Sequence, residues 1–132
     1  MAVIFVVDDY AVHREALRSF LRKRGHEVVT AQDGEEALEK MKAWRPDLMV
    51  LDLWMPNVDG LGVLAALRES AGEAACPVIV TTAVTDADTL RRATELGARQ
   101  VLLKGDFSMA KLADAIVGAL PGAGGIGVKV PA

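Results

Sequence analysis

Cysteine is scarce in this sequence, and its scarcity excludes one class of fold. Cys76 is the only cysteine among 132 residues, so the chain has no second cysteine for an internal disulfide. A small secreted fold held together by disulfides is therefore excluded, and the composition is compatible with a reducing compartment. Cys76 lies in an apolar stretch before Pro77, where we expect a buried small hydrophobic residue rather than a reactive thiol.

The sequence also lacks long apolar runs and any excess of positive charge. The apolar residues 1–7 have no basic leader before them and are far fewer than a membrane span needs. We therefore expect a cytoplasmic protein that does not enter a membrane. The formal net charge is −3, without a long run of lysine or arginine, so no direct nucleic-acid binding is indicated.

The residues that are present are typical of one globular domain. Hydrophobic residues make up 52% of the chain and charged residues 25%, which is too apolar for a disordered protein. A chain of this length can enclose a core. After Leu120 the composition becomes rich in glycine and proline. We expect one domain over residues 1–120 and a flexible tail or linker over residues 121–132.

Five short, β-branched apolar runs alternate with five helical patterns. The runs are Val3–Val7, Glu27–Ala31, Asp47–Leu51, Pro77–Thr81 and Gln100–Leu103. The helical patterns are Ala11–Arg24, Glu35–Ala43, Leu61–Arg68, Asp86–Leu96 and about Met109–Leu120, the last capped by Asp106 or Ser108. Runs that are apolar almost throughout suit parallel strands covered on both faces. The alternation predicts an α/β fold with a doubly wound, five-stranded parallel sheet.

The first helical pattern also sets the expectation for the two histidines. On its inner side we expect Val12, Ala16, Leu17, Phe20 and Leu21. His13 then lies among polar residues of this helix, and His26 lies in the turn that follows. We expect both histidines to be surface residues rather than phosphodonors.

Acidic residues follow two of the predicted strands. Asp8 and Asp9 come directly after the first strand, and Asp52 closes the third. Ligands of open α/β sheets bind outside the carboxyl ends of the strands, so neighbouring strands would bring these three carboxylates together. Two carboxylates ~4 Å apart repel by about 4 kcal/mol at an effective dielectric near 20, which calls for a cation. Carboxylates, waters and a phosphoryl group are ligands that suit Mg²⁺.

Ordinary structural roles exist for the same residue types. Asp8 and Asp9 alone could cap the following helix, and Asp52 alone could be a turn residue. Thr82 could be an ordinary strand residue and Lys104 a solvated surface lysine. Their positions favour function instead, because acid, acid, hydroxyl and cation occur at the ends of strands one, three, four and five. The hydroxyl could donate to a phosphoryl oxygen, and the ammonium group could pair with a carboxylate.

These motifs resemble those of bacterial response-regulator receiver domains over roughly residues 3–119. They are Val6-Val7-Asp8-Asp9, Leu51-Asp52-Leu53-Trp54-Met55-Pro56-Asn57-Val58-Asp59-Gly60, Val80-Thr81-Thr82-Ala83 and Leu103-Lys104. The resemblance implies a (βα)₅ flavodoxin-like fold with strand order 2-1-3-4-5. It also implies a phosphoprotein of a two-component system or phosphorelay. Such a protein takes its phosphoryl group from a sensor histidine kinase or a phosphotransfer protein.

The resemblance assigns a role to each site residue. Asp52 resembles the phosphoacceptor and a direct Mg²⁺ ligand, Asp9 the second carboxylate ligand, and Asp8 a carboxylate that acts through a metal-bound water. Trp54 would add its backbone carbonyl to the metal site. Thr82 resembles the switch hydroxyl, preferred to its neighbour Thr81 because a small residue follows it. Lys104 is similar to the lysine that pairs with the phosphoryl group.

Two positions depart from the family pattern and bear on output. Val101 stands where the family usually has an aromatic switch residue, and Gly105 stands where many receivers have proline. Phosphorylation is expected to repack the face made by the fourth helix, fifth strand and fifth helix, toward an unknown effector or a phosphorylation-dependent dimer. These two residues leave open a receiver-like scaffold that phosphorylation does not regulate.

An enzyme of a different class is the remaining alternative. An aspartate-nucleophile phosphohydrolase also places an aspartate after an apolar strand, but it usually carries a second acid two residues on. Trp54 occupies that position here. We therefore expect no enzyme, only self-phosphotransfer and slow autodephosphorylation.

Overall fold

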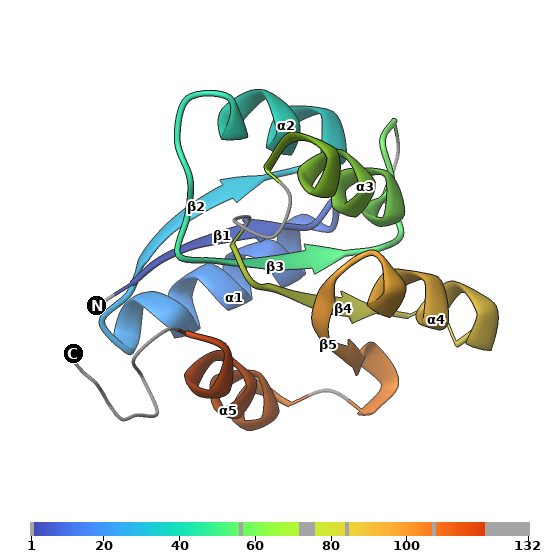
Figure 1. Cartoon of the computed structure of the whole chain (residues 1–132). Helices are drawn as coiled ribbons and strands as arrows, with labels where there is room; N and C mark the ends of the chain where they lie inside the picture. Colours follow the sequence, from blue (N-terminus) through green and yellow to red (C-terminus); the bar gives the residue numbers. More distant parts are fainter. Residues whose placement is uncertain (1, 56, 72–75, 84, 107, 121–132) are drawn as a thin grey trace.

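The computed structural model describes residues 2–55, 57–71, 76–83, 85–106 and 108–120. The predicted tail at 121–132, and Pro56 of the central motif, lie outside these described residues. Five strands and five α-helices alternate along the described chain, as the sequence predicts (Figure 1). The strands are β1 (Val3–Val7), β2 (Glu27–Ala31), β3 (Leu48–Asp52), β4 (Val78–Thr82) and β5 (Ala98–Leu103). The helices are α1 (Ala11–Lys23), α2 (Gly34–Met41), α3 (Gly60–Ala71), α4 (Ala87–Glu95) and α5 (Met109–Ala119), with a short 3₁₀ helix at Lys104–Asp106.

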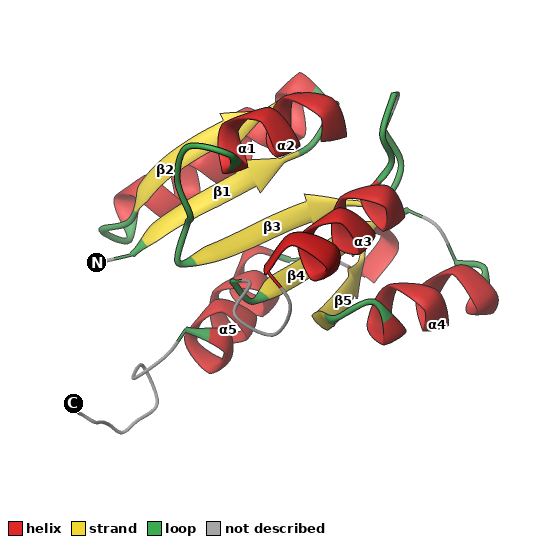
Figure 2. Cartoon of the chain, turned by 45° about the horizontal axis from the view of Figure 1, so that its top comes forward, coloured by secondary structure: helices red, strands yellow, loops and turns green. Residues whose placement is uncertain are grey.

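All five strands run parallel in one sheet, in the order β2-β1-β3-β4-β5. This order confirms the predicted (βα)₅ flavodoxin-like receiver topology. Helices cover both faces of the sheet (Figure 2). The strand that follows β1 in the chain lies on one side of it, and the later strands β3, β4 and β5 lie on its other side. In doubly wound sheets the ligand site forms where the order reverses in this way, here between β1 and β3.

Side chains that alternate along each strand supply two separate cores. Strand residues such as Phe5, Met49 and Val80 pack with α2, α3 and α4 on one face. Ile4, Val50 and their neighbours pack with α1 and α5 on the other face. Because β3 is buried along its whole length, its last residue is carried into the interior with the rest of the strand.

Polar side chains cap the first turn of three helices. Asp33, Asp86 and Ser108 each accept a hydrogen bond from a backbone N–H three residues ahead, which satisfies a donor that the first helical turn leaves unpaired. Ser108 therefore caps α5. None of the helices in the described ranges is long and apolar enough to span a membrane.

Two sequence expectations about packing have different outcomes. Cys76 is buried, and burial raises the pKa of its thiol to about 11, so it is the inert hydrophobic residue expected. The expected inner face of α1 is wrong at two positions. Val12 is 67% exposed and Ala16 is also exposed, while Leu17 and Leu21 are fully buried. The helix is therefore turned about its axis relative to the expectation.

Candidate functional site

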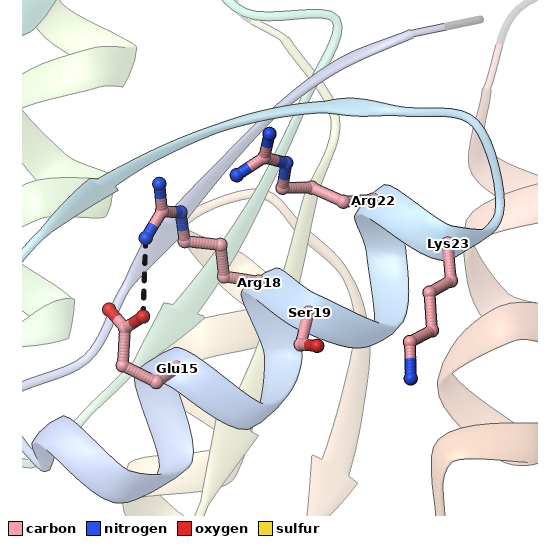
Figure 3. Close-up of a pocket in the computed structure, with 5 residues that line it drawn as sticks. All are labelled: Glu15, Arg18, Ser19, Arg22 and Lys23. Carbon is pink, nitrogen blue, oxygen red and sulfur yellow. Dashed lines mark hydrogen bonds and ion pairs between the residues drawn. The ribbon is translucent and has the colours of Figure 1, made fainter.

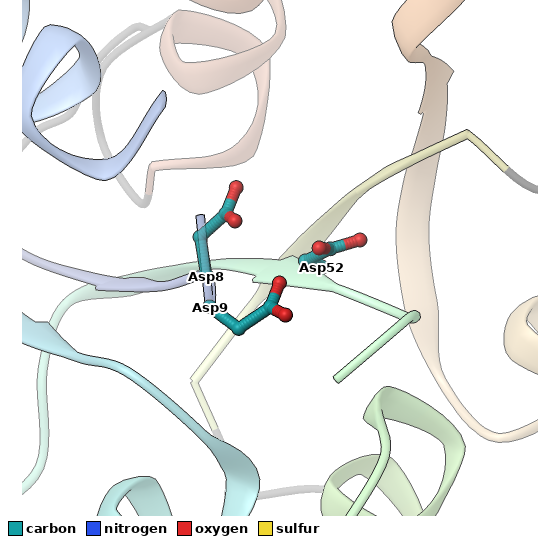
Figure 4. A group of neighbouring side chains, drawn as sticks. All are labelled: Asp8, Asp9 and Asp52. Carbon is teal, nitrogen blue, oxygen red and sulfur yellow. The ribbon is translucent and has the colours of Figure 1, made fainter. Parts of the chain in front are cut away.

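Three carboxylates meet at the carboxyl end of the sheet. Asp8 and Asp9 follow β1, Asp52 ends β3, and these two strands are paired in register from Ile4–Leu48 to Val7–Leu51. One carboxylate oxygen from each residue lies within 4.8 Å of the others. Figure 4 shows the three side chains projecting from the ends of the two strands. The convergence that the sequence predicts is therefore confirmed.

Asp8 is held by hydrogen bonds on both carboxylate oxygens. Oδ1 accepts from the backbone N–H of Tyr10 at 2.9 Å, and Oδ2 is in contact with Nδ1 of His13 and lies 3.4 Å from Nζ of Lys104. Burial works to raise the pKa of Asp8. The bond from His13, the Tyr10 N–H and the Lys104 ammonium outweigh burial and hold the pKa below its ordinary value. Asp8 is thus an ionised, firmly positioned carboxylate.

A helix-capping role for the first two aspartates is wrong. The N-cap position of α1 is Tyr10, and no side chain caps that end of the helix. The carboxylate of Asp8 instead accepts from the backbone N–H of Tyr10, two residues ahead. Arg14 of α1 donates to the backbone carbonyl of Asp8 at 2.8 Å. Asp9 is exposed and makes no hydrogen bond or ion pair with the other described residues. Its carboxylate is available to a cation.

Asp52 sits in a less favourable environment than Asp8. It is 3% exposed, its Oδ1 accepts from the backbone N–H of Trp54 at 3.2 Å, and its Oδ2 lies 3.4 Å from Nζ of Lys104. Burial raises the pKa of Asp52, Lys104 opposes that effect, and the charge of Asp8 adds to it. The result is a pKa above the ordinary value. Trp54 itself is 74% exposed, so it is its backbone rather than its indole ring that contacts the carboxylate of Asp52.

Lys104 joins the two buried carboxylates. Its Nζ is 3.4 Å from an oxygen of Asp8 and 3.4 Å from an oxygen of Asp52, across 96 and 52 residues of chain. The strand order makes this contact, because β4 and β5 continue the sheet beyond β3 and the lysine follows β5 directly. The alternative of a solvated surface lysine is therefore wrong. Its ammonium group contacts two of the three carboxylates of the pocket.

Two adjacent threonines end β4, and they occupy different faces of the sheet. Thr81 is the register partner of Asp52 and shares strand parity with Ile79, which packs toward α1 and α5. Thr82 shares parity with Val80 on the opposite face. Both are fully buried. Among the described residues the hydroxyl of Thr81 is buried without a hydrogen-bond partner.

His13 was missed as a site residue, because it was expected on the surface. Its side chain is 17% exposed and its Nδ1 contacts the carboxylate of Asp8. A signal was present in the sequence, since His13, Leu17 and Leu21 are spaced four residues apart and form one helical stripe. Leu17 and Leu21 are fully buried on that stripe. The burial of the two leucines turns the histidine toward the end of β1.

Two other hollows on the described surface have a different lining. One depression of about 490 Å³ lies along α1, and its lining is Glu15, Arg18, Ser19, Arg22 and Lys23 (Figure 3). A second, of similar size, continues from the same two arginines toward the start of β2. Both are basic and contain no aspartate from a strand end.

Comparison with known families agrees with this geometry. Residues 4–117 match the family described as response regulator receiver domain. The chain belongs to the response-regulator receiver family. A receiver is a phosphoacceptor module of two-component signalling rather than an enzyme, so the phosphohydrolase alternative is excluded.

Named relatives of this receiver are longer proteins. The probable transcriptional regulator ycf27 of Porphyridium aerugineum is 43% identical over 101 residues, which are 76% of this chain and 41% of that protein. The transcriptional regulatory protein PdtaR of Mycobacterium tuberculosis is 37% identical over 114 residues, or 86% of this chain and 54% of that protein. The chain therefore spans about half the length, or less, of these two relatives.

Solved receivers share the fold over nearly the whole chain. The response regulator protein TrrA of Thermotoga maritima, in complex with Mg²⁺-BeF, is 32% identical with a TM-score of 0.80, covering 91% of this chain and 100% of that one. The chemotaxis response regulator CheY4 of Vibrio cholerae is 30% identical with a TM-score of 0.82, covering 91% and 99%.

Proposed function

We propose that this receiver takes one phosphoryl group on Asp52, in the presence of Mg²⁺, from the phosphohistidine of a sensor kinase or phosphotransfer protein. One observation carries the proposal. A buried carboxylate at the end of β3 lies 3.4 Å from the ammonium group of Lys104, with two further carboxylates within 4.8 Å. Membership of the receiver family supports the same reaction.

The acid pocket fits a hard divalent cation. Two carboxylate charges 4.8 Å apart repel by on the order of 3 kcal/mol at an effective dielectric near 20, and Lys104 contacts only two of the three groups. Asp9 and Asp52 would bind Mg²⁺ directly, Asp8 through a water, and Trp54 through its backbone carbonyl. When bound, Mg²⁺ neutralises charge on the carboxylates and on the transferred phosphoryl group. The TrrA structure contains Mg²⁺-BeF, which supports this choice of metal.

The chain's own residues position and stabilise the reacting group. One oxygen of Asp52 forms a bond to phosphorus while the bond from phosphorus to the donor's imidazole nitrogen breaks, and its electron pair returns to that nitrogen. Lys104 leaves its carboxylate partners to pair with an equatorial phosphoryl oxygen. Thr82 donates its hydroxyl to a second such oxygen. The N–H of Trp54 holds Asp52 in place, since it already donates to that carboxylate.

Output from this site would pass through the α4–β5–α5 face. Movement of Thr82 at the end of β4 reaches β5 directly, because Thr82 is the register partner of Leu103 and Val80 that of Val101. Val101 is half-buried against the core beside α4 and is smaller than the usual aromatic residue. We propose that output here relies on packing of α4 against β5 rather than on rotation of an aromatic side chain. The downstream partner is an effector or a second phosphorylated copy.

The phosphoacceptor role is tested by incubating the chain with Mg²⁺ and acetyl phosphate. Intact mass should show one phosphoryl group per chain, and hydroxylamine should remove it, as expected of an acyl phosphate. Asp52→Asn should take up none. Asp114→Asn, at an exposed position of α5, is the matched control and should be labelled like the parent.

A phosphorylated receiver and a scaffold that phosphorylation does not regulate give different outcomes in this assay. A receiver gains one stable adduct, and EDTA prevents it. A scaffold that phosphorylation does not regulate gains none with Mg²⁺ present. Labelling of the Asp52→Asn variant to the parent level would contradict the assignment of the phosphoacceptor.

A further inference from the structure

We infer that His13 is a positioning residue of the metal site, which holds the carboxylate of Asp8 in place through an N–H donated from Nδ1. The inference rests on the proposed function, since it concerns binding of Mg²⁺ in the same pocket. It adds a residue that lies outside the acid, hydroxyl and lysine motifs of the sequence. Its basis is the position of one helix relative to the sheet.

The orientation of α1 brings the histidine to Asp8. Ala11 begins the helix three residues after Asp8, so His13 lies in its first turn. Leu17 and Leu21 follow on the same stripe and pack into the core that contains Ile4 of β1. This packing places His13 over the carboxyl end of β1, where 17% of its side chain remains exposed.

The direction of the hydrogen bond follows from the charge of its partner. A carboxylate has no hydrogen to donate and can only accept, as Oδ1 of Asp8 does from the N–H of Tyr10. Nδ1 of His13 therefore carries the proton that lies between the two groups. The imidazole needs no positive charge for this role, because its neutral form has one N–H.

The bond matters because Asp8 Oδ2 has a second partner that the reaction removes. Lys104 lies 3.4 Å from Oδ2 of Asp8 and 3.4 Å from Oδ2 of Asp52. When Lys104 moves to a phosphoryl group, His13 is the side chain that stays on Oδ2, while the N–H of Tyr10 stays on Oδ1. Asp8 then keeps its orientation toward the metal through the reaction. Hydrogen-bonded partners of metal-site carboxylates have this function in other metalloproteins.

Three substitutions separate the hydrogen bond from the bulk of the side chain. His13→Leu and His13→Ala remove the donor, and leucine suits a stripe that continues through two buried leucines. His13→Asn keeps an N–H close to the position of Nδ1. His26→Asn is the matched control, since His26 lies in the turn after α1 and accepts from the backbone N–H of Ala2.

The test is isothermal titration of each variant with MgCl₂ alone, without a phosphodonor. His13→Leu and His13→Ala should bind Mg²⁺ about 10- to 100-fold more weakly than the parent. His13→Asn should recover most of the loss, and His26→Asn should bind like the parent. Urea unfolding in EDTA, run in parallel, measures any loss of folding separately from the loss of metal affinity.

Several results would overturn the inference, and one would also overturn the proposed function. Parental affinity in both His13→Leu and His13→Ala would show that the histidine does not support the metal site. Equal weakness of His13→Asn and His13→Leu would show that the donated N–H is not the cause. A parent chain that binds no Mg²⁺ would overturn both the inference and the proposed function. Failure of phosphorylation with normal Mg²⁺ binding would overturn the proposed phosphorylation of Asp52 and leave the role of His13 in metal binding unaffected.

Discussion

Asp8 and Asp52 are the same residue type, 3.4 Å from the same ammonium nitrogen, yet their pKa values shift in opposite directions. Both are buried, and burial raises the pKa of each. Asp8 has two additional donors, from His13 and Tyr10, which stabilise its ionised form. Asp52 has one additional donor, from Trp54, and also faces the charge of Asp8. Of these two buried carboxylates, the phosphoacceptor candidate Asp52 is thus the one whose ionised form is less stabilised by its surroundings.

Asp52→Asn is expected to raise the free energy of unfolding at pH 7, measured by urea unfolding in EDTA. The pKa of Asp52 in the folded chain is above the ordinary value of 3.8. The stability that its protonated carboxyl group adds to the fold is therefore fully present below pH 3.8 and is lost as the pH rises through the folded-state pKa. At neutral pH the ionised side chain therefore destabilises the fold. The gain from asparagine should shrink as the pH is lowered toward 3.8. An Asp52→Asn chain that is less stable than the parent at pH 7 would contradict this account.

Thr81→Val is expected to raise the free energy of unfolding by about 1 kcal/mol, because the buried Thr81 hydroxyl lacks a hydrogen-bond partner among the described residues. Valine has nearly the same shape and carries no polar atom. Thermal or urea unfolding of the two chains checks the prediction. A loss of stability would show that the hydroxyl is satisfied in solution, for example by a water beside Asp52.

Elements position the site through close backbone contacts as well as through side chains. Gly60 begins α3, and its N–H donates to the carbonyl of Leu53 at 3.0 Å. A Cβ added at Gly60 would lie 2.6 Å from the carbonyl oxygen of Asp52 and 2.6 Å from Cα of Leu53. The helix can therefore approach the end of β3 only because this residue has no side chain.

Gly60→Ala is expected to lower the free energy of unfolding by about 1–3 kcal/mol, since the methyl group forces α3 away from the end of β3. It should also weaken Mg²⁺ binding. The added methyl group displaces the backbone carbonyl of Asp52 and therefore shifts the carboxylate of the same residue. Gly118→Ala is the matched control in α5, where an added Cβ meets nothing within 4 Å. That change should instead stabilise by about 0.5 kcal/mol. Similar effects of the two substitutions would contradict the proposed crowding.

The extent of each element could be predicted from the sequence to within a few residues. β1 and β2 have the predicted bounds, whereas β3 and β4 each begin and end one residue later than expected. At the start of β3 the difference has a physical cause. Asp47 is used outside the strand, where its carboxylate accepts from the N–H of Val3 at 2.7 Å. Side-chain bonds across 44 residues of chain are not visible in a local apolar pattern.

At the scale of the whole molecule, two cores on opposite faces of one sheet carry the stability. α5 contributes Leu112 and Ile116 to the core on the α1 side, and Leu120 ends that helix with an N–H donated to Ile116 at 3.0 Å. The described members of both cores all lie within residues 2–120. We propose that the receiver domain comprises residues 1–120.

A chain that ends at Leu120 is expected to unfold cooperatively, with a free energy of unfolding within about 0.5 kcal/mol of the full chain. Its Mg²⁺ affinity should also be unchanged. A chain that ends at Ser108 is the contrasting case, because it loses α5 and with it Leu112 and Ile116 of the core on the α1 side. That shorter chain should not unfold cooperatively. A large loss of stability on ending at Leu120 would overturn the proposed boundary.

The sequence by itself determined the approximate elements, the parallel sheet and the placing of Asp8, Asp9 and Asp52 at strand ends, because apolar runs and helical spacing are local properties. The three carboxylates meet because β1 and β3 are neighbours in the sheet, which the family resemblance implied and the structure shows. Only the tertiary structure decided how α1 is turned about its axis. Two stripes along that helix, one from Val12 and one from His13, have the same four-residue spacing. Packing of the buried leucines into the core selects the second stripe, and this choice brings the histidine to the carboxylate of Asp8.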